Sequence, residues 1–347
     1  MLNHGGQLQH AKIQYPLVSK PWLDLSTGIA PWTWPVPQIP VEVWQRLPED
    51  SPELQRAAQI FYRSPDAEVL AVSGSQAAIE KIPTIISRGA VALPLWGYAE
   101  HQKAWQKAGH HLHFYRNREE LSTWIESGKV QHVVIINPNN PTAEWLESSQ
   151  IERWQLQLST HNGYLLVDEA FADALAPSDK TAAMLINRRA SNLIVLRSVG
   201  KFFGLAGLRL GFVLGSPAIL EQLRAQLALW SVSHPAQWLG LRLLNDECWH
   251  QQQRQRIEDA NAKLLKLLRE CLPSSMADEL KSSSLFVSLF GHREVLKNIH
   301  EMLAQQGIWV RFFEPQQARA GLRFGLTDDD GLARLRVALT SESCRFF

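Results

Sequence analysis

Short runs of apolar residues alternate with longer amphipathic stretches through the middle of the chain. Several runs are apolar throughout instead of alternating with polar residues, which is typical of strands buried on both faces of a sheet. The pattern predicts strands at Glu68–Val72, Ala90–Leu95, His111–Tyr115, His132–Asn137, Tyr164–Asp168, Leu193–Arg197 and Leu210–Leu214.

The stretches between these runs have the spacing of helices. They are Ser75–Arg88, Tyr98–Ala108, Leu121–Ser127, Ser148–Ser159 and Lys180–Arg189. Gly89 and Gly109 follow two of them, where a glycine often ends a helix. Strands that alternate with helices form a mainly parallel sheet with helices on both faces. The pattern therefore predicts a three-layer α/β domain.

The C-terminal third has a different pattern. From Pro217 to Cys271 it is mostly helical, with a break near Pro235, because proline interrupts the hydrogen bonds of a helix. A smaller α+β unit is predicted by the segments that follow, Leu285–Phe290, Arg293–Gln306, Ile308–Phe313 and Leu322–Leu326.

The first forty residues are rich in proline and predict an irregular, partly extended arm. We therefore expect an arm over residues 1–40 that packs on the small domain or a partner subunit. The large domain is expected over residues 41–232 and the small domain over residues 233–347.

The overall charge excludes some kinds of partner. Among 347 residues, 35 Lys and Arg stand against 34 Asp and Glu, so no excess of cations is available to neutralise the phosphates of a nucleic acid. No apolar stretch approaches the ~18 residues of a membrane span. We expect no nucleic-acid or membrane partner.

Cysteine and histidine content predicts neither disulfides nor a metal site. The three cysteines are odd in number and widely spaced, which fits a reducing cytoplasm. The N-terminal residues lack the apolar segment of a secretion signal. The cluster His110, His111 and His113 has no cysteine or acidic companions, so no metal is expected. A cytoplasmic globular protein is predicted.

A single lysine, Lys201, lies in a glycine-rich and otherwise apolar run after a predicted strand. Burial lowers the pKa of a lysine because its charged form loses hydration, and the neutral amine is then available for Schiff-base chemistry. Ser198 and Arg209 flank it, and a hydroxyl and a guanidinium suit a phosphate group. A surface lysine in a tight loop would have the same local pattern, so both interpretations stay open on this evidence.

Polar residues also follow other predicted strands. Asp168 and Glu169 would need a glycine-rich phosphate loop to serve as metal ligands of a nucleotide site, and the sequence has none. They are then either a solvated strand end or carboxylates at the sheet edge where ligands of open α/β folds bind. Gly74 and Ser75 begin a helix whose N–H groups suit an anion, although both residues are also common helix caps. Asn140 lies in a Pro-Asn-Asn-Pro turn.

In this order along the chain, these segments resemble the pyridoxal-phosphate enzymes of fold type I, the aspartate aminotransferase superfamily, over almost the whole sequence. The resemblance implies pyridoxal 5'-phosphate as cofactor. It assigns catalytic roles to Lys201, which binds the cofactor covalently, and to Asp168, which pairs with the pyridine nitrogen. The implied cofactor contacts are Gly74, Ser75, Gln76, Asn140, Ser198 and Arg209, with His101 as the stacking aromatic residue and Tyr98 as the second choice.

Within this superfamily the sequence is most similar to threonine-phosphate decarboxylases of cobalamin biosynthesis, which are themselves similar to histidinol-phosphate aminotransferases. The segments His4-Gly5-Gly6, Leu23–Pro31 and Arg197–Phe212 carry this similarity. It implies a homodimeric lyase that converts L-threonine O-3-phosphate to (R)-1-amino-2-propanol O-2-phosphate. The implied substrate contacts are His4, Gly28, Ile29, Asn140, Arg311 and Arg323.

Two positions depart from the aminotransferase pattern. Phe171 stands where those enzymes have a tyrosine that contacts the cofactor, in agreement with the decarboxylases. Leu47 stands where the aminotransferases have a tyrosine that reaches the cofactor phosphate in the partner subunit. A leucine has no hydroxyl to make this contact.

The sequence leaves the reaction open. Decarboxylation and transamination differ in which bond of the substrate Cα stands perpendicular to the cofactor ring, and residue identities alone do not decide it. Transamination of histidinol phosphate or a related amino acid is therefore the alternative. A non-catalytic protein that only carries the cofactor is a third interpretation.

Overall fold

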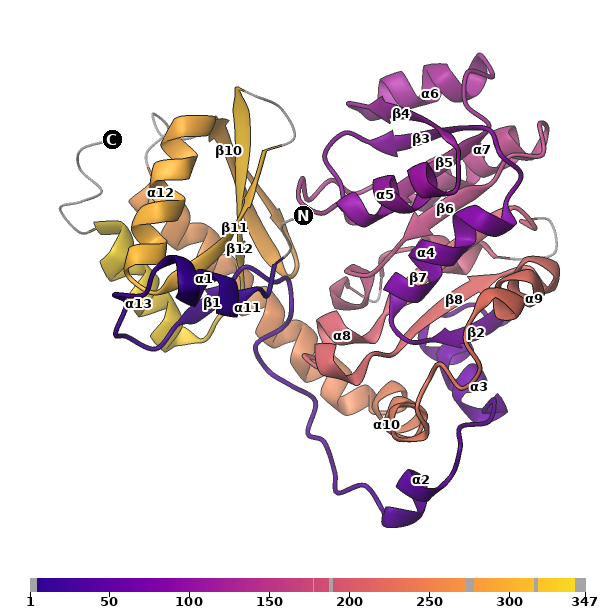
Figure 1. Cartoon of the computed structure of the whole chain (residues 1–347), viewed down its shortest axis with the longest axis horizontal. Helices are drawn as coiled ribbons and strands as arrows, with labels where there is room; N and C mark the ends of the chain where they lie inside the picture. The colour runs from indigo at the N-terminus through magenta and orange to yellow at the C-terminus, as the bar shows by residue number, and fades with distance from the viewer. Residues whose placement is uncertain (1–4, 177, 187–189, 273–277, 315–317, 341–347) are drawn as a thin grey trace. The chain divides into compact units, whose positions relative to one another are not determined.

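The computed structural model describes residues 5–176, 178–186, 190–272, 278–314 and 318–340 (Figure 1). Its described part forms two compact units. The large unit comprises residues 33–140 and 144–251, and the small unit comprises the chain up to residue 32, residues 141–143 and the chain from residue 252. The large unit extends past the predicted boundary at residue 232 because α10 (His234–Leu244) packs against α3 (Pro52–Phe61).

The large unit is built on a mixed sheet in the order β2-β8-β7-β6-β5-β3-β4 among the described residues. All neighbouring pairs from β7 to β4 are parallel, and β8 runs antiparallel to both β7 and β2. The strands are β2 Glu68–Val72, β3 Ala90–Pro94, β4 His111–Tyr115, β5 His132–Ile136, β6 Leu165–Asp168, β7 Leu193–Ser198 and β8 Gly211–Gly215. The predicted α/β architecture is confirmed.

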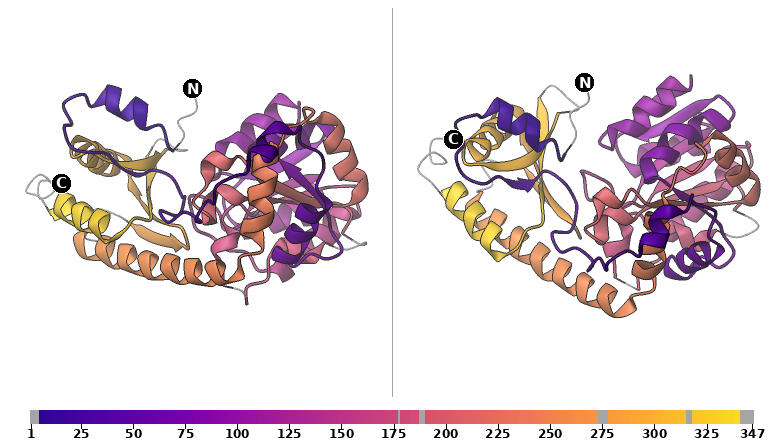
Figure 2. Two further views of the ribbon diagram at one scale, coloured as in Figure 1. Left: turned by 90° about the horizontal axis from the view of Figure 1, so that it is seen from below. Right: turned by 60° about the horizontal axis from the view of Figure 1, so that its bottom comes forward.

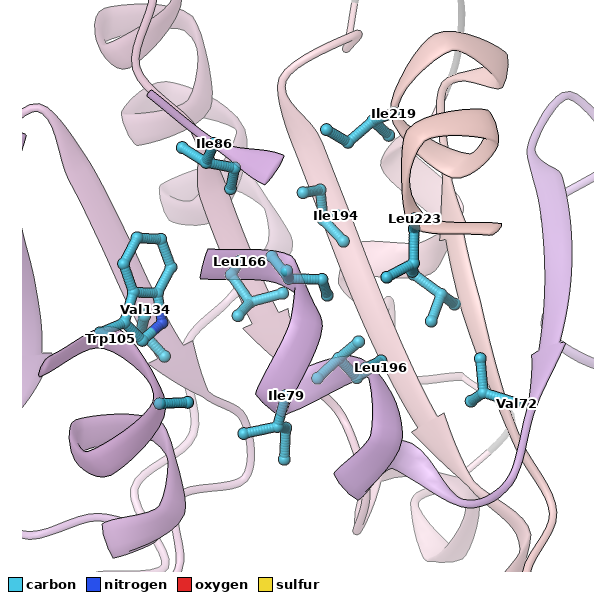
Figure 3. Packing of buried hydrophobic residues seen from close by; sticks show 14 of the residues in the cluster. Val72, Ile79, Ile86, Trp105, Val134, Leu166, Ile194, Leu196, Ile219 and Leu223 are labelled. Carbon is cyan, nitrogen blue, oxygen red and sulfur yellow. The ribbon is translucent and has the colours of Figure 1, made fainter. Parts of the chain in front are cut away.

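Helices cover both faces of this sheet. They are α2 Val41–Gln45, α3 Pro52–Phe61, α4 Ser75–Ile85, α5 Ala99–Lys107, α6 Arg118–Glu126, α7 Ser148–Ser159, α8 Val199–Phe202, α9 Pro217–Gln226 and α10 His234–Leu244, with 3-10 turns at Ala172–Ala174, Ala182–Leu185 and Ala206–Leu208. On one face, α4, α5 and α9 bury a continuous apolar core against the strands (Figure 3). Ile79 of α4 and Trp105 of α5 belong to the same cluster as Leu166 and Leu196 of the sheet (Figure 3). Helices α6 and α7 contact each other and lie on β4 and β6.

Two local predictions in this unit are wrong. Within the described residues of Lys180–Arg189, the chain forms only the 3-10 turn Ala182–Leu185, because the N–H groups of Ala182 and Ala183 donate to the Glu169 carboxylate. Gly89 does not cap α4, which ends at Ile85. The Gln131 side chain packs against it instead, and a Cβ there would lie 2.2 Å from Gln131 Oε1.

The small unit contains the second sheet, with the described order β1-β11-β12-β10-β9. Its elements are α1 Leu8–Gln14, β1 Leu23–Leu25, α11 Glu247–Cys271, β9 Glu279–Ser283, β10 Phe286–His292, α12 Arg293–Gln305, β11 Ile308–Phe313, β12 Arg319–Gly325 and α13 Asp329–Thr340. The helix α11, orange in Figure 2, is uninterrupted and begins in the large unit.

The expected irregular arm is partly regular. Its residues Leu23–Leu25 form β1, which pairs in parallel with β11, and its helix α1 buries Ala11 against Trp309. A three-residue strand and a seven-residue helix carry too little periodicity to be recognised before the sheet they join is known.

Buried His132 predicts how stability changes with pH. Its Nε2–H donates to the Ser87 carbonyl at 2.9 Å and its Nδ1 accepts from Tyr164 N–H at 3.1 Å, so the ring is neutral. Burial lowers its pKa from 6.5 to about 4. Because the unfolded chain binds this proton more tightly, the free energy of unfolding should fall by on the order of 3 kcal/mol as the pH drops from about 6.5 to 4.

Urea unfolding of the wild-type protein and of His132→Gln across this range measures the effect. The variant is less stable near pH 7, and the difference between the two proteins should shrink as the pH falls. A difference that stays constant with pH would contradict the prediction.

Candidate active site

A buried carboxylate lies at the centre of the large sheet's carboxyl edge. Asp168 is the last residue of β6 and is 4% exposed. Its Oδ2 accepts a hydrogen bond of 2.9 Å from His101 Nε2, and its Oδ1 accepts from Ala170 N–H at 3.0 Å. An ionised carboxylate can only accept, so the donor in a bond to it is the His101 Nε2–H.

His101 therefore has a partner that the sequence did not reveal. It was expected only as a stacking aromatic residue, yet its ring edge is bonded to Asp168, and its Nδ1 has no hydrogen-bond partner among the described residues. The two residues are separated by 67 positions and belong to different strand–helix repeats. No sequence spacing signals such a pair.

Lys201 lies in the short helix α8, directly after β7. It is only partly exposed, and its Nζ lies 5.5 Å from the centre of the Phe171 ring, which is itself buried. This apolar neighbour is the residue that replaces the aminotransferase tyrosine. The Lys201 amine therefore lies beside an aromatic face that carries no hydroxyl.

The start of α4 has a guanidinium beside it. Gly74 has φ +75°, and a Cβ there would lie 2.5 Å from Arg209 Nη2, so the Arg209 side chain packs directly on the backbone before the helix. Gly211 likewise lets its strand approach Ser75 N, which a Cβ at Gly211 would reach at 2.8 Å. Ser198 is the register partner of Gly211. Helix N–H groups, a hydroxyl and a guanidinium thus gather at one place, which suits a phosphate.

The side chain of Gln76 is engaged within the protein. Its Oε1 accepts from Tyr98 O–H at 3.2 Å, and its Nε2 donates to Glu80 at 3.1 Å and to Glu100 at 3.3 Å. Its backbone N–H is therefore the group suited to a phosphate. The Tyr98 ring lies 6.3 Å from the His101 ring, nearly perpendicular to it.

The Pro-Asn-Asn-Pro turn is anchored by residues that the sequence analysis did not single out. Asn137 exchanges two hydrogen bonds with Leu146, and its N–H donates to the Asp168 carbonyl at 2.8 Å. Asn139 donates to the Trp96 carbonyl at 2.8 Å. These bonds hold the chain at Asn137 and Asn139, directly before Asn140, which is partly buried.

The predicted substrate residues belong to the small unit. Arg311 and Arg323 are directly opposed on the neighbouring strands β11 and β12. Arg323 is buried and donates to the Ser26 carbonyl at 2.6 Å. Its pKa is lowered to about 9, first by burial and then by the charge of Arg311. Two opposed cations repel each other, so an anion bound beside them would relieve this cost.

The N-terminal glycines lie at the same place in the small unit. Gly6 N–H donates to Ser26 Oγ at 2.8 Å, and Gly5 packs so tightly that a Cβ would lie 2.4 Å from the Ser26 carbonyl oxygen that Arg323 also contacts. Gly28 and Ile29 follow two residues later in the chain. His4 lies outside the described residues, and its assignment stays a prediction.

Comparison with known proteins identifies the family. Residues 46–339 match the family model described as aminotransferase class I and II. This chain is a member of that family.

Two curated relatives are similar to this chain over nearly their full length. A threonine-phosphate decarboxylase of Pseudomonas aeruginosa is 41% identical over 98% of this chain and 97% of its own. A threonine-phosphate decarboxylase of a Sinorhizobium species is 32% identical over 96% and 98%. The solved histidinol-phosphate aminotransferase of Sinorhizobium meliloti, in complex with pyridoxal-5'-phosphate, shares the fold with a TM-score of 0.81 at 17% identity, over 99% of this chain and 95% of that one.

The large unit of this family member fits pyridoxal phosphate as cofactor. The cradle at Gly74 and Arg209 suits its phosphate, the buried Asp168 suits its pyridine nitrogen, and the amine of Lys201 suits its aldehyde. The described residues bring together no group of three His, Cys, Asp or Glu side chains able to hold a metal ion. None of the described helices is long and apolar enough to cross a membrane.

Proposed function

We propose that this chain is a pyridoxal-phosphate-dependent lyase that decarboxylates L-threonine O-3-phosphate to (R)-1-amino-2-propanol O-2-phosphate, a step of cobalamin biosynthesis. The observation that carries the proposal is the 41% identity to a threonine-phosphate decarboxylase over 98% of the chain. The opposed arginines Arg311 and Arg323 support it, because a phosphorylated amino acid brings two anionic groups.

The residues of the large unit have separate tasks in this proposal. When bound, pyridoxal phosphate supplies an electron sink for the charge left on the substrate Cα after a bond is broken. Lys201 holds the cofactor covalently. Asp168 keeps a proton on the pyridine nitrogen, and His101 holds Asp168 in place. Phe171 brings no hydroxyl to the amine of Lys201.

Transamination of histidinol phosphate or a related amino acid is the alternative, favoured by the shared fold with a histidinol-phosphate aminotransferase. The two reactions are separated by incubating the holoenzyme with threonine phosphate or histidinol phosphate, each with and without 2-oxoglutarate. We expect carbon dioxide from threonine phosphate without a keto acid. Glutamate formation that requires 2-oxoglutarate would support the transaminase, and neither product would support a carrier protein.

The two arginines should differ in how they affect phosphorylated and unphosphorylated substrates. Arg323 is assigned to the α-carboxylate, which threonine and its phosphate share, and Arg311 to the phosphate. Lysine cannot reproduce the two-point contact of a guanidinium. Arg323→Lys should therefore reduce kcat/KM for both substrates similarly, whereas Arg311→Ala should weaken threonine phosphate more, by about tenfold or greater for a lost charge-assisted contact.

The measurement is kcat/KM for both amino acids with wild-type enzyme and each variant. Equal losses for both substrates in Arg311→Ala would mean that the phosphate is bound by other residues.

We also propose that the enzyme acts as a homodimer in the cytoplasm, the compartment expected from its cysteine content. Trp44, Leu47, Leu229 and Trp230 are exposed large apolar residues of the large unit. Trp230 and Leu229 line a cavity of about 470 Å³ together with residues 48–51. Exposed apolar residues beside such a hollow are typical of a protein interface.

Sedimentation of the Trp230→Glu variant tests this assembly. We expect a dimer for the wild-type protein and a shift toward monomer for Trp230→Glu, because a charge would be buried in the interface. Leu156→Glu, which changes an exposed leucine of α7, is the matched control and should remain dimeric. A monomeric wild-type protein would contradict the proposal.

A further inference from the structure

A buried ionic cluster lies next to the proposed cofactor residues. Arg197 donates through Nη1 to Glu169 Oε2 at 2.7 Å and through Nη2 to Asp173 Oδ1. All three side chains are buried, and the Arg197 guanidinium lies 4.5 Å from the centre of the Tyr62 ring. Glu169 also accepts from Ala182 N–H at 2.6 Å. None of these groups has a task in the chemistry described above.

The cluster joins the two strand ends that carry the catalytic residues. Glu169 directly follows Asp168 at the end of β6, and Arg197 directly precedes Ser198 at the end of β7. Asp168 is the register partner of Leu196, and Glu169 N–H donates to the Leu196 carbonyl at 2.9 Å. Because side chains alternate between the faces of a strand, Asp168 and Glu169 point to opposite sides. The ionic contacts therefore lie behind the face that holds the cofactor.

Stability alone does not explain such a cluster. Burying charged groups removes their hydration, and apolar replacements of buried ion pairs are often neutral or stabilising. Burial raises the pKa of Glu169, and the charge of Arg197 opposes that shift. What an arginine adds beyond charge is a rigid, planar fork that fixes two carboxylates in one geometry.

We propose that Arg197, Glu169 and Asp173 are positioning residues that brace the ends of β6 and β7 and thereby set the separation between the Asp168 carboxylate and the Lys201 amine. The inference rests on the proposed pyridoxal-phosphate function, but it holds for either reaction. Lys201 lies in α8, which begins directly after β7, only four residues after Arg197, so a shift of the strand end moves the amine directly. Misplacing a reacting group by about 1 Å can cost on the order of a hundredfold in rate.

Two variants test the brace. Arg197→Lys keeps the charge but lacks the fork, and Glu169→Gln keeps the shape but lacks the charge. We expect each to bind the cofactor and to lower kcat by about 10- to 100-fold with little change in KM, because the catalytic groups are misplaced while the substrate contacts are intact. The pH at which the visible absorption of the bound cofactor changes should also move in both variants, since the distance from its ring to Asp168 is altered.

Asn192→Ala is the matched control. Asn192 directly precedes β7 at the opposite end of the strand and makes buried hydrogen bonds to Gln155 and to the Gly163 carbonyl. The Asn192→Ala variant should have a lower thermal unfolding temperature than the wild-type protein, with unchanged kcat and an unchanged absorption profile. If Arg197→Lys and Glu169→Gln behave like this control, or if neither of them folds, the cluster is purely structural and the proposal is overturned.

The absorption profile is recorded on the holoenzyme without substrate, which separates the two proposals. Wild-type enzyme that releases no carbon dioxide from threonine phosphate contradicts the proposed function only. Unchanged absorption in both variants contradicts the brace only.

Discussion

Lys201→Ala protein is expected to lose all of its borohydride-fixable pyridoxal phosphate while retaining its fold. Lys201 is the lysine at the carboxyl end of β7, and its amine is placed beside the buried ring of Phe171. Alanine is a good helix former, and position 201 lies in the short helix α8, so we expect little change in the free energy of unfolding. Without this amine, no covalent link to the cofactor aldehyde forms at the site, and turnover should fall below detection.

Mass spectrometry after borohydride reduction measures the link directly. Wild-type protein should gain one cofactor adduct, and a tryptic peptide that contains Lys201 should carry it. Lys107→Ala, which changes an exposed lysine of α5, is the matched control and should be labelled like wild type. An adduct that persists in Lys201→Ala would contradict the assignment of this lysine.

Asp168→Asn should lower turnover by two to three orders of magnitude. Asparagine keeps the shape of the side chain but is not a charge partner for a protonated pyridine nitrogen. Removing a charge-assisted bond in a buried site costs ~2–5 kcal/mol, and each 1.4 kcal/mol is a factor of ten in rate. Asp168 also accepts hydrogen bonds from His101 Nε2 and from Ala170 N–H. An asparagine in its place has an amide nitrogen that cannot accept, so one of these two bonds is lost if the amide oxygen makes the other.

Single-turnover and steady-state rates with threonine phosphate measure the loss, and the visible absorption of the bound cofactor shows whether the site is still loaded. Asp66→Asn, at an exposed aspartate before β2, should have wild-type rates. If Asp168→Asn retained more than about a tenth of normal turnover, the carboxylate would lie outside the reacting site.

Much of the large unit was readable from local pattern alone. The predicted strand Glu68–Val72 and helix Ser148–Ser159 agree with the structure to the residue. Fully apolar runs such as that of β5 are informative because a strand covered on both faces has no solvent side on which to place polar residues. The family was recognisable from the order of several segments together, those around Gly74, Asn140, Asp168, Lys201 and Arg209, although none of them is decisive by itself.

Contacts between distant segments were decided only by the tertiary structure. The bond from His101 to Asp168 joins α5 to β6, and the cluster of Arg197, Glu169 and Asp173 joins the ends of β6 and β7. Such pairs depend on strand order in the sheet, where β5 separates β3 from β6, and no spacing in the sequence encodes that order.

The short elements of the small unit also depend on tertiary contacts. Strand β1 has three residues and exists because β11 offers an edge to pair with, and Gly5 is required because Ser26 approaches it closely. The sequence by itself determined the buried strands, the long helices and the family, because those depend on periodicity and on local motifs. The tertiary structure alone decided the partners of the buried charges, because desolvation favours whichever opposite charge the fold brings within reach.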